Sequence, residues 1–250
     1  MAMKFWHQST NELSRIDSYR RGLLAHAEKL YGKDIELHVQ GLAEGTYGDL
    51  SPSDALGNAY LYQRVLSPII ENAIQAEQQG YDAFVMGSFS EPFLREMRTA
   101  VNIPVVSLTE AALLVGCSLG GQIGLISNAP NVAYMTKLSV AKHHLEARVT
   151  EITALSPGMN EYELIAARDE PSGLIAAFSE TARVLIAKGA EVIVPAEGVM
   201  AEILARERLT AIDKSVVLDV FAAAWGHAMT LARLQKVGLG VSRAWLYSRG

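Results

Sequence analysis

Two polar residues, Ser88 and Glu197, stand at the ends of apolar runs of strand length in this 250-residue chain. A carboxyl group in a dry cleft can have its pKa raised towards neutrality and then serve as a general acid or base. A serine hydroxyl can donate a hydrogen bond to a carbonyl or enolate oxygen, and it acts as a nucleophile only where a nearby base activates it. Glu197 is therefore a candidate acid or base, and Ser88 is a candidate donor to a developing oxyanion.

Both residues also have a structural interpretation. Residues 88–91, Ser-Phe-Ser-Glu, fit a capping box, and Pro92 suits the first turn of a helix. Glu197 would be a first-turn glutamate, stabilised by the helix dipole by roughly 0.3–1 kcal/mol. Because a helix N-terminus is itself an anion site, capping and substrate binding are compatible, and both interpretations stay open.

Three other segments carry polar residues that could bind a substrate. Ser9 and Asn11 could hold a carboxylate or amide at a helix N-terminus, or could simply cap that helix. Tyr47 stands in a glycine-containing loop that could close over a cleft, with an exposed loop tyrosine as the alternative. Ser127 and Asn128 end another apolar run, where they would be anion ligands or turn residues before a proline.

Apolar runs alternate along the chain with segments that have the period of an amphipathic helix. The sequence predicts strands at 3–8, 35–41, 82–87, 103–107, 122–127, 147–154, 191–195 and 215–218. It predicts helices from a capping box at 9–12 to about 31, and at 53–79, 91–99, 109–118, 131–144, 173–188, 198–207 and 219–237, with long loops at 43–52 and 155–172. This alternation is typical of a parallel sheet with helices on both faces.

A long internal repeat adds to this pattern. Residues 80–88 and residues 189–197 share a helix-ending glycine, a small turn, an acidic residue, an apolar strand and a polar residue. At nearly the same offset, residues 105–107 match residues 216–218, although two unrelated strand-helix units could produce so loose a match. The repeat indicates two similar lobes. Ligands bind outside the carboxyl ends of parallel strands, so the polar residues that end the two repeats could face each other across a cleft.

Three segments resemble a known family. Residues 82–94, Asp-Ala-Phe-Val-Met-Gly-Ser-Phe-Ser-Glu-Pro-Phe-Leu, resemble the first signature of hydantoin racemases, in the aspartate/glutamate racemase superfamily. Residues 189–200 resemble the second signature, and residues 238–243 with Tyr247 resemble the C-terminal end of the family. The similarity covers nearly the whole chain and is more specific for the fold than for the reaction.

The resemblance implies a mechanism with one cysteine on each lobe, of which one removes the α-proton and the other returns it. Here Ser88 stands at the first cysteine position, and Glu197, or a neighbour within one position, stands at the second. Cys117, the only cysteine, ends a predicted helix and is expected to be a small buried residue rather than a nucleophile. The sequence also resembles a branch of the superfamily that reads Pro-Ala-Glu-Gly at the second site and lacks both cysteines.

These observations together define a candidate site. His7 ends the first predicted strand, where the family holds a substrate-contacting turn, and it is either catalytic or structural. The candidate catalytic residues are Glu197, Ser88 and His7, and the candidate substrate-binding residues are Gln8, Ser9, Asn11, Tyr47, Phe89, Ser127, Asn128 and Gly198. No metal site is expected, because only His143 and His144 are close in sequence, and adjacent helix residues do not share a face. These two histidines are expected on a solvated helix face, and Thr109 and Asp219 are each expected to cap a helix.

The predicted fold is α/β, with two pseudo-symmetric Rossmann-like lobes, a parallel sheet in each, and a cleft between them. The resemblance implies that the N-terminal lobe takes the C-terminal helix. We therefore expect an N-terminal lobe of residues 1–104 plus 219–250 and a C-terminal lobe of residues 105–218.

Composition excludes several classes of function. The net charge is −5, and no Lys/Arg cluster could neutralise a run of phosphates, which argues against nucleic acid binding. No apolar run reaches the roughly 18–20 residues that span a bilayer, and the N-terminus lacks the apolar stretch of a signal peptide. No dinucleotide or Walker A fingerprint is present, so no cofactor is expected. We expect a soluble cytoplasmic protein that forms homo-oligomers, as relatives do.

The resulting functional hypothesis is a racemase-like isomerase that acts at a carbon next to a carboxylate, amide or imide carbonyl of a small substrate, with a non-cysteine acid/base. One alternative is a hydrolase or a decarboxylase/lyase on the same scaffold. Another is a non-catalytic protein that binds a small molecule.

Overall fold

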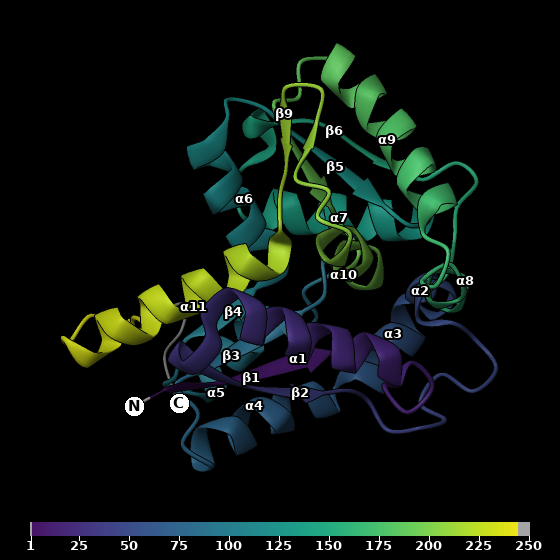
Figure 1. Ribbon diagram of the computed structural model, residues 1–250. Coiled ribbons are helices and arrows are strands. Elements are labelled where there is room, and N and C mark those ends of the chain that lie inside the picture. The colour runs from purple at the N-terminus through teal and green to yellow at the C-terminus, as the bar shows by residue number, and fades with distance from the viewer. Residues whose placement is uncertain (1, 245–250) are drawn as a thin grey trace.

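Two sheets, one above the other in Figure 1, form the framework of the molecule. The computed structural model describes residues 2–244. The first sheet is parallel throughout, in the order β2-β1-β3-β4, and consists of β1 (Met3–Ser9), β2 (Ile35–Gln40), β3 (Ala83–Gly87) and β4 (Val105–Ser107). The second has the order β6-β5-β7-β9-β8 and consists of β5 (Ile123–Ser127), β6 (Val149–Ala154), β7 (Val192–Pro195), β8 (Ala211–Ile212) and β9 (Ser215–Val217). Only its β8–β9 pair is antiparallel.

The strand order agrees with the predicted repeat. In the first sheet β3 lies between β1 and β4, and in the second β7 lies between β5 and β9. The carboxyl ends of β3 and β7, which precede Ser88 and Glu197, therefore hold equivalent positions in the two lobes.

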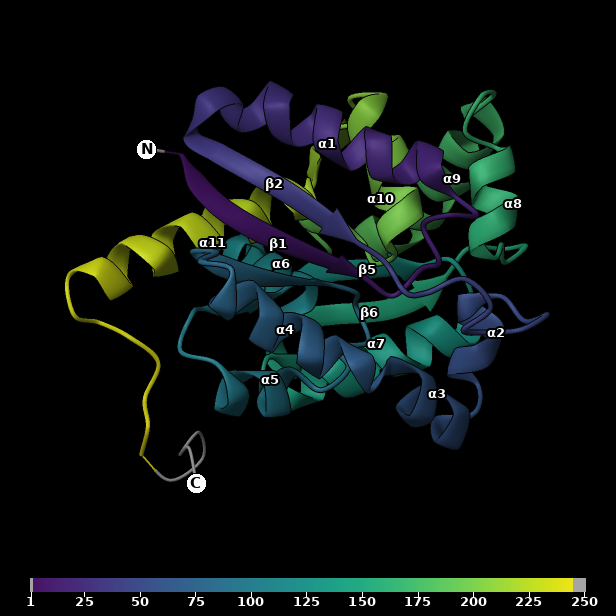
Figure 2. The ribbon, with the colours of Figure 1, turned by 90° about the horizontal axis from the view of Figure 1, so that it is seen from below.

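The strands of the first sheet are apolar on both faces because helices cover both faces. Phe5 and Val85 pack on the side that faces the second lobe, in a core that continues into that lobe. Their neighbours Trp6, Phe84 and Met86 point the other way, into a separate core under the helices α2 to α5. Figure 2 shows α4 and α5 in front of this outer face.

Eleven α-helices are described within residues 2–244. They are α1 (Asp17–Tyr31), α2 (Pro52–Leu56), α3 (Ala59–Leu66), α4 (Pro68–Gln78), α5 (Leu94–Ala100), α6 (Leu108–Leu119), α7 (Pro130–Lys142), α8 (Glu161–Ala166), α9 (Ser172–Ala187), α10 (Gly198–Arg206) and α11 (Val220–Lys236). Short 3-10 turns at Gly32–Asp34 and Glu146–Arg148 follow α1 and precede β6. None of the helices described is long and apolar enough to cross a membrane.

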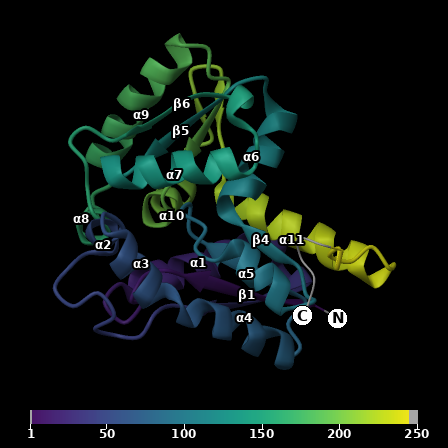
Figure 3. The same ribbon diagram turned by 180° about the vertical axis from the view of Figure 1, so that it is seen from behind.

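The C-terminal helix α11 leaves the second sheet and packs against α6 and against β3 and β4 of the first sheet (Figures 1 and 3). Its Trp225 is fully buried and stacks on Phe221 at 5.5 Å between ring centroids. Asp219 begins the helix by accepting hydrogen bonds from the backbone N–H groups of Phe221 and Ala222, so its predicted capping role is confirmed. The Asp219 carboxylate also binds His26 Nε2 of α1 at 2.7 Å.

Asp219→Ala should therefore destabilise the protein by about 1–2 kcal/mol, the usual range for loss of an N-cap. Urea unfolding followed by circular dichroism measures this effect. Asp169→Ala, at an exposed aspartate outside the helices, is the control and should leave the unfolding midpoint unchanged. Equal midpoints for the two variants would show that the cap and its histidine contact contribute nothing.

Several predicted boundaries are wrong for identifiable reasons. The first helix begins at Asp17 and not after residue 9, because the Glu12 carboxylate accepts hydrogen bonds from Gly45 N and Tyr47 N of a distant loop instead of forming a capping box. The predicted helix 53–79 is three helices, α2 to α4, since Asn58 starts α3 as an N-cap and Pro68 starts α4.

The predicted loop 155–172 contains α8, whose N-terminus has a capping box formed by Asn160 and Glu163. Strand β4 belongs to the first sheet, so the first lobe extends beyond the predicted boundary at residue 104, at least to Ser107. The C-terminal Tyr247 lies outside the described residues.

Candidate active site

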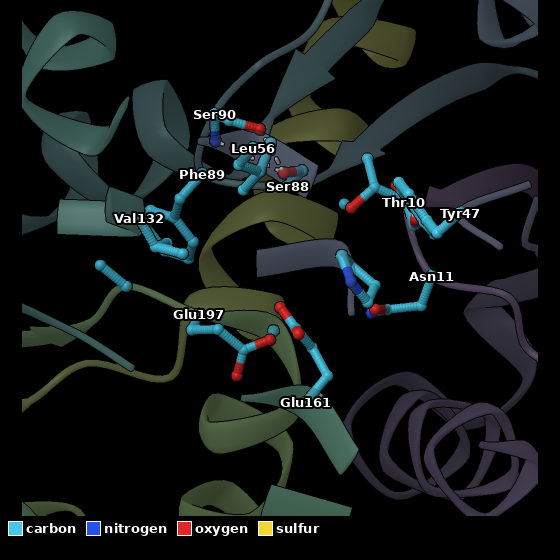
Figure 4. Close-up of a pocket in the computed structure, with 14 residues that line it drawn as sticks. Thr10, Asn11, Tyr47, Leu56, Ser88, Phe89, Ser90, Val132, Glu161 and Glu197 are labelled. Atoms are coloured by element: carbon cyan, nitrogen blue, oxygen red, sulfur yellow. Dashed lines mark hydrogen bonds between the residues drawn. The ribbon is translucent and has the colours of Figure 1, made fainter. Parts of the chain in front are cut away.

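A small cavity lies between the lobes, at the carboxyl ends of β1, β3 and β7 (Figure 4). Its volume is about 30 Å³, which is enough to hold water. The first lobe contributes Thr10, Asn11, Tyr47, Pro52, Leu56, Gly87, Ser88, Phe89 and Ser90, and the second contributes Val132, Glu161, Ala196, Glu197 and Gly198. The two lobes meet closely around the cavity, and both supply its walls.

Glu197 is the N-cap of α10, and its carboxyl group points into the cavity. One carboxyl oxygen accepts a hydrogen bond from Val199 N at 2.9 Å and the other from Met200 N at 2.7 Å. Burial, reinforced by the negative charge of Glu161, raises the pKa of Glu197 to about 8, against the opposing effect of these backbone donors. Glu197 therefore does stabilise the start of a helix, but as the N-cap residue and not as a residue of the first turn. The same carboxyl group is suited to acid/base chemistry.

The second carboxyl group in the cavity, Glu161, was not predicted from the sequence. It is 5% exposed and begins α8, and Figure 4 draws it beside Glu197. Its carboxylate accepts hydrogen bonds from Ser53 N at 3.2 Å and from Ser53 Oγ. Burial raises the pKa of Glu161, partly offset by these bonds. Two acidic groups therefore share one desolvated space, which disfavours ionisation of both.

The first lobe contributes hydroxyl groups to the opposite side of the cavity (Figure 4). Tyr62 Oη donates a hydrogen bond to Ser90 Oγ at 2.8 Å, and Ser90 Oγ lies 2.8 Å from Ser88 Oγ. Burial raises the pKa of the Tyr62 phenol, so that Tyr62 stays a donor. When Ser90 donates its hydrogen bond to Ser88 Oγ, the Ser88 hydroxyl is free to donate into the cavity.

Ser88 and Ser90 do not cap a helix. Helix α5 begins only at Leu94, and Phe93 before it adopts a left-handed φ of 54° without any side-chain cap. The capping box predicted at residues 88–91 is therefore wrong. Glu91 instead binds Ser107 and His143 in a buried contact, His143 Nε2 lying 2.8 Å from the nearer oxygen. His143 is consequently not on a solvated face, which corrects that expectation, whereas His144 is exposed.

Asn11 and Tyr47 line the cavity from the first lobe. Asn11 Oδ1 is buried and has no hydrogen-bond partner, so it is available to a substrate donor. Tyr47 is buried rather than exposed, and its hydroxyl donates to Thr10 O at 2.7 Å. Glu12 fixes the same loop by accepting from Tyr47 N at 2.9 Å.

The segment 41–58, here called the lid, closes the cavity by reaching across to the second lobe (Figure 2). Ser53 is its main anchor. The Ser53 hydroxyl donates to Glu161 and accepts from Asn128 Nδ2 at 2.9 Å, while Ser53 O accepts from Asn131 Nδ2. Since this anchor contacts a cavity carboxyl group, opening the lid also changes the environment of Glu161.

Ser53→Ala should loosen the lid, because the serine hydroxyl makes two of its contacts with the second lobe. We expect Ser53→Ala to lower the local stability of the lid by about 1.4 kcal/mol, which corresponds to roughly tenfold faster amide exchange in this segment. Hydrogen exchange with mass spectrometry measures this in peptides that cover the lid. Ser118→Ala, at an exposed serine of α6, is the control. Unchanged exchange in the lid would show that the serine does not anchor it.

The structure brings together six of the predicted site residues and leaves five outside the cavity lining. The six in the lining are Asn11, Tyr47, Ser88, Phe89, Glu197 and Gly198. His7 is fully buried on β1 under Trp225, whose Nε1 lies 3.4 Å from His7 Nδ1. Burial lowers the pKa of His7 to about 3, so it is neutral, and its position supports the structural interpretation over the catalytic one.

Gln8, Ser9, Ser127 and Asn128 have structural contacts instead. Gln8 points to the outer core, where its Oε1 accepts from Trp6 and from Asn72. Ser9 Oγ accepts from Asn11 N in a turn, and Ser127 Oγ lies 3.4 Å from Thr136 Oγ1. Asn128 does not line the cavity, but it donates a hydrogen bond to Ser53 of the lid, and Ser53 in turn binds Glu161.

Thr10, Ser90, Val132 and Glu161 line the cavity without having been predicted to do so. A signal for Glu161 was present, because Asn160 and Glu163 have the spacing of a capping box that begins a helix. Thr109 does not cap α6 as expected; Ser107 does, and Thr109 Oγ1 donates to Phe89 O. Cys117 is half-buried on α6 and is not among the residues that line the cavity.

Comparison with known proteins identifies the family. The model of the Asp/Glu/Hydantoin racemase family matches residues 52–228, which is most of the chain. A hydantoin racemase from Pseudomonas sp. (strain NS671) is 26% identical over 175 residues, covering 68% of this chain and 69% of that protein.

Solved structures share the fold. Allantoin racemase from Klebsiella pneumoniae superimposes with a TM-score of 0.77 at 18% identity, over 100% of this chain and 94% of that chain. A liganded variant of arylmalonate decarboxylase gives a TM-score of 0.61 at 17% identity, over 92% of this chain and 93% of that chain. With its two matched lobes and the match of the family model over residues 52–228, this chain belongs to the Asp/Glu/Hydantoin racemase family.

Proposed function

We propose that this protein is an isomerase that inverts a carbon centre next to a carboxylate, amide or imide carbonyl of a small substrate, with Glu197 as its acid/base. The observation that carries the proposal is the buried Glu197 carboxyl group at the carboxyl end of β7, across the cavity from the Ser88 hydroxyl. Hydantoins and related cyclic imides are the first substrates to test, because the relatives include a hydantoin racemase and an allantoin racemase.

The chemistry follows from the two sides of the cavity. Ionised Glu197 removes the proton from the carbon next to the carbonyl, and the electron pair of that C–H bond moves onto the carbonyl oxygen. The Ser88 hydroxyl donates to this oxygen as its negative charge develops. With a pKa of about 8, roughly a tenth of Glu197 is ionised at pH 7 and the rest is protonated, so both the base and the acid form are available.

The proton must return to the opposite face for inversion to occur. Glu161, the other carboxyl group in the cavity, is the available second acid, and its raised pKa keeps a proton on it more readily than on an exposed glutamate. Because both carboxyl groups lie on the same side of the cavity, inversion requires the planar intermediate to turn over between its contact with Glu197 and its contact with Glu161. In this proposal two carboxyl groups of the second lobe replace a pair of cysteines on opposite lobes.

One observation favours a second candidate, a decarboxylase. Both carboxyl groups come from the second lobe, whereas the first lobe offers only hydroxyl, amide and apolar groups. A site with its acids on one side is suited to protonating a carbanion from one face, which is what loss of CO₂ from an α-carboxylate requires. Arylmalonate decarboxylase has the same fold.

Proton NMR in D₂O separates these functions. The protein is incubated with substituted hydantoins, allantoin, amino acids and arylmalonates. The isomerase proposal predicts replacement of the α-proton by deuterium together with loss of optical rotation. Release of CO₂ with a deuterated product of one configuration identifies a decarboxylase, and a ring-opened product identifies a hydrolase. Absence of any exchange or product across this panel would contradict the isomerase proposal.

The expectations of a cytoplasmic protein and a homo-oligomer accompany this proposal. Sedimentation equilibrium tests the second, because a mass above the 27.1 kDa of one chain would establish association.

A further inference from the structure

A second cavity, separate from the active site, lies between the two lobes and is lined by cationic side chains. Its volume is about 290 Å³, and it is bounded by α1 of the first lobe and by α10 and neighbouring segments of the second. The lining residues are Gly22, Ala25, His26, Lys29, Arg168, Glu202, Arg206 and Arg208. Four permanent cations thus face one carboxylate, in a chain whose net charge is −5.

The cations in this basic cavity differ in how far they are already engaged. Arg168 binds the buried carboxylate of Glu202 at 3.0 Å, and Arg206 binds Glu207 at 2.8 Å. Lys29 and Arg208 are exposed, and neither forms an ion pair with the residues that the structure describes. The single acid in the lining is therefore already paired, which leaves Lys29 and Arg208 as the cations that can take an outside partner.

The shape of the basic cavity depends on close packing at its floor. A Cβ atom on Gly22 would lie 2.0 Å from Glu202 Oε1 and 3.0 Å from Arg168 Nη2. Glycine at this position lets α1 approach the buried pair, so that the guanidinium group of Arg168 is held at the bottom of the cavity. His26, with a side chain only 8% exposed, forms part of the wall and is fixed by Asp219 at 2.7 Å.

We propose that the basic cavity binds a small multivalent oxyanion, a phosphate compound or a di- or tricarboxylate, with Lys29 and Arg208 as its main charged contacts. Guanidinium groups suit such anions because their N–H donors pair with two oxygens at once. Lys29 comes from the first lobe and Arg208 from the second, so the bound anion would link the lobes. The proposal does not depend on the reaction proposed above.

The position of the basic cavity gives the anion a means of acting on the active site. Helix α10 runs from Glu197, its N-cap in the active-site cavity, to Arg206 in the basic cavity. Tyr19 of α1 is fully buried beside the start of this helix, where a Cβ atom on Gly198 would lie 2.6 Å from Tyr19 Oη. An anion held between α1 and α10 would therefore stabilise the closed arrangement of the two lobes.

Thermal unfolding with defined anions tests the proposal. The protein is titrated with phosphate, pyrophosphate or citrate, and sodium chloride keeps the ionic strength constant. We expect a saturable rise in Tm with at least one of these anions. A response to phosphate and pyrophosphate alone assigns the phosphate class, and a response to citrate alone assigns the carboxylate class.

The double variant Lys29→Ala/Arg208→Ala should raise the dissociation constant at least about tenfold, the loss expected from removing charged hydrogen bonds. Both side chains are exposed, so its Tm without anion should match that of the parent protein. Lys33→Ala/Arg233→Ala removes the same charges at exposed positions outside the cavity and should bind normally. Absence of a saturable response in the parent protein, or equal weakening in the two double variants, would overturn the proposal.

Discussion

Glu197→Gln should lower the turnover number by about 10²- to 10⁴-fold, the usual contribution of a general acid or base. Glutamine has nearly the same shape and keeps one oxygen to accept from the N-terminus of α10, but it cannot give up or take a proton. Loss of Ser88 should cost less, since Ser88→Ala removes one donor and leaves the carboxyl groups in place. Steady-state kinetics on whichever substrate shows exchange in D₂O measures both.

The controls distinguish lost chemistry from lost structure. Glu180→Gln makes the same change at an exposed glutamate and should leave turnover unaltered. Far-ultraviolet circular dichroism should show the same helix content in all variants, because glutamine at position 197 still has one oxygen that accepts a hydrogen bond from the N-terminus of α10. Turnover of Glu197→Gln within threefold of the parent protein would remove this residue from the mechanism.

The stability difference between the parent protein and Glu197→Gln should depend steeply on pH. In the folded protein the pKa of Glu197 is raised from 4.5 to about 8, so the folded state keeps a proton that the unfolded chain loses. Between these two values the folded state binds more protons, and the free energy of unfolding of the parent falls as pH rises. The slope is about 1.4 kcal/mol per pH unit at most.

Below pH 4.5 and above pH 8 the contribution of Glu197 should become constant, because folded and unfolded states then carry the same charge at this group. Glutamine does not titrate, so subtracting the free energies of the two proteins isolates the Glu197 effect. Urea unfolding at half-unit intervals from pH 4 to pH 9 provides the data. A difference that stays flat over this range is incompatible with a raised pKa at Glu197.

Sequence reasoning predicted the parts of the fold that depend on local pattern. Apolar runs that end at a polar residue predicted β3 and β7. The pattern that these two runs share indicated two related lobes. The N-cap Asp219 and the return of α11 to the first lobe were also predicted, the second through resemblance to a family. Ser88 and Glu197 were found because they follow closely on β3 and β7, whose carboxyl ends face the cavity between the lobes.

The errors arise where a distant contact overrides a local pattern. Residues 9–12 look like a capping box, but Glu12 is used by the loop that carries Tyr47, so α1 starts later. The sequence supports a catalytic and a structural role for His7 equally well, and only the packing of Trp225 over it favours the structural role.

Glu161 was missed for a similar reason. Its role depends on a lid from the other lobe, whose Ser53 lies 108 positions away in sequence. No periodicity or spacing within either segment encodes that meeting.

The protonation state of Glu197 is the most direct test of the proposed mechanism. Glutamate labelled with ¹³C at Cδ reports carboxyl ionisation by NMR, and Glu197→Gln identifies the Glu197 signal by its disappearance. We expect this signal to titrate near pH 8, so that the group is mainly a neutral acid at pH 7. Titration near its ordinary value of 4.5 would show a permanently ionised cap and would contradict its role as an acid/base.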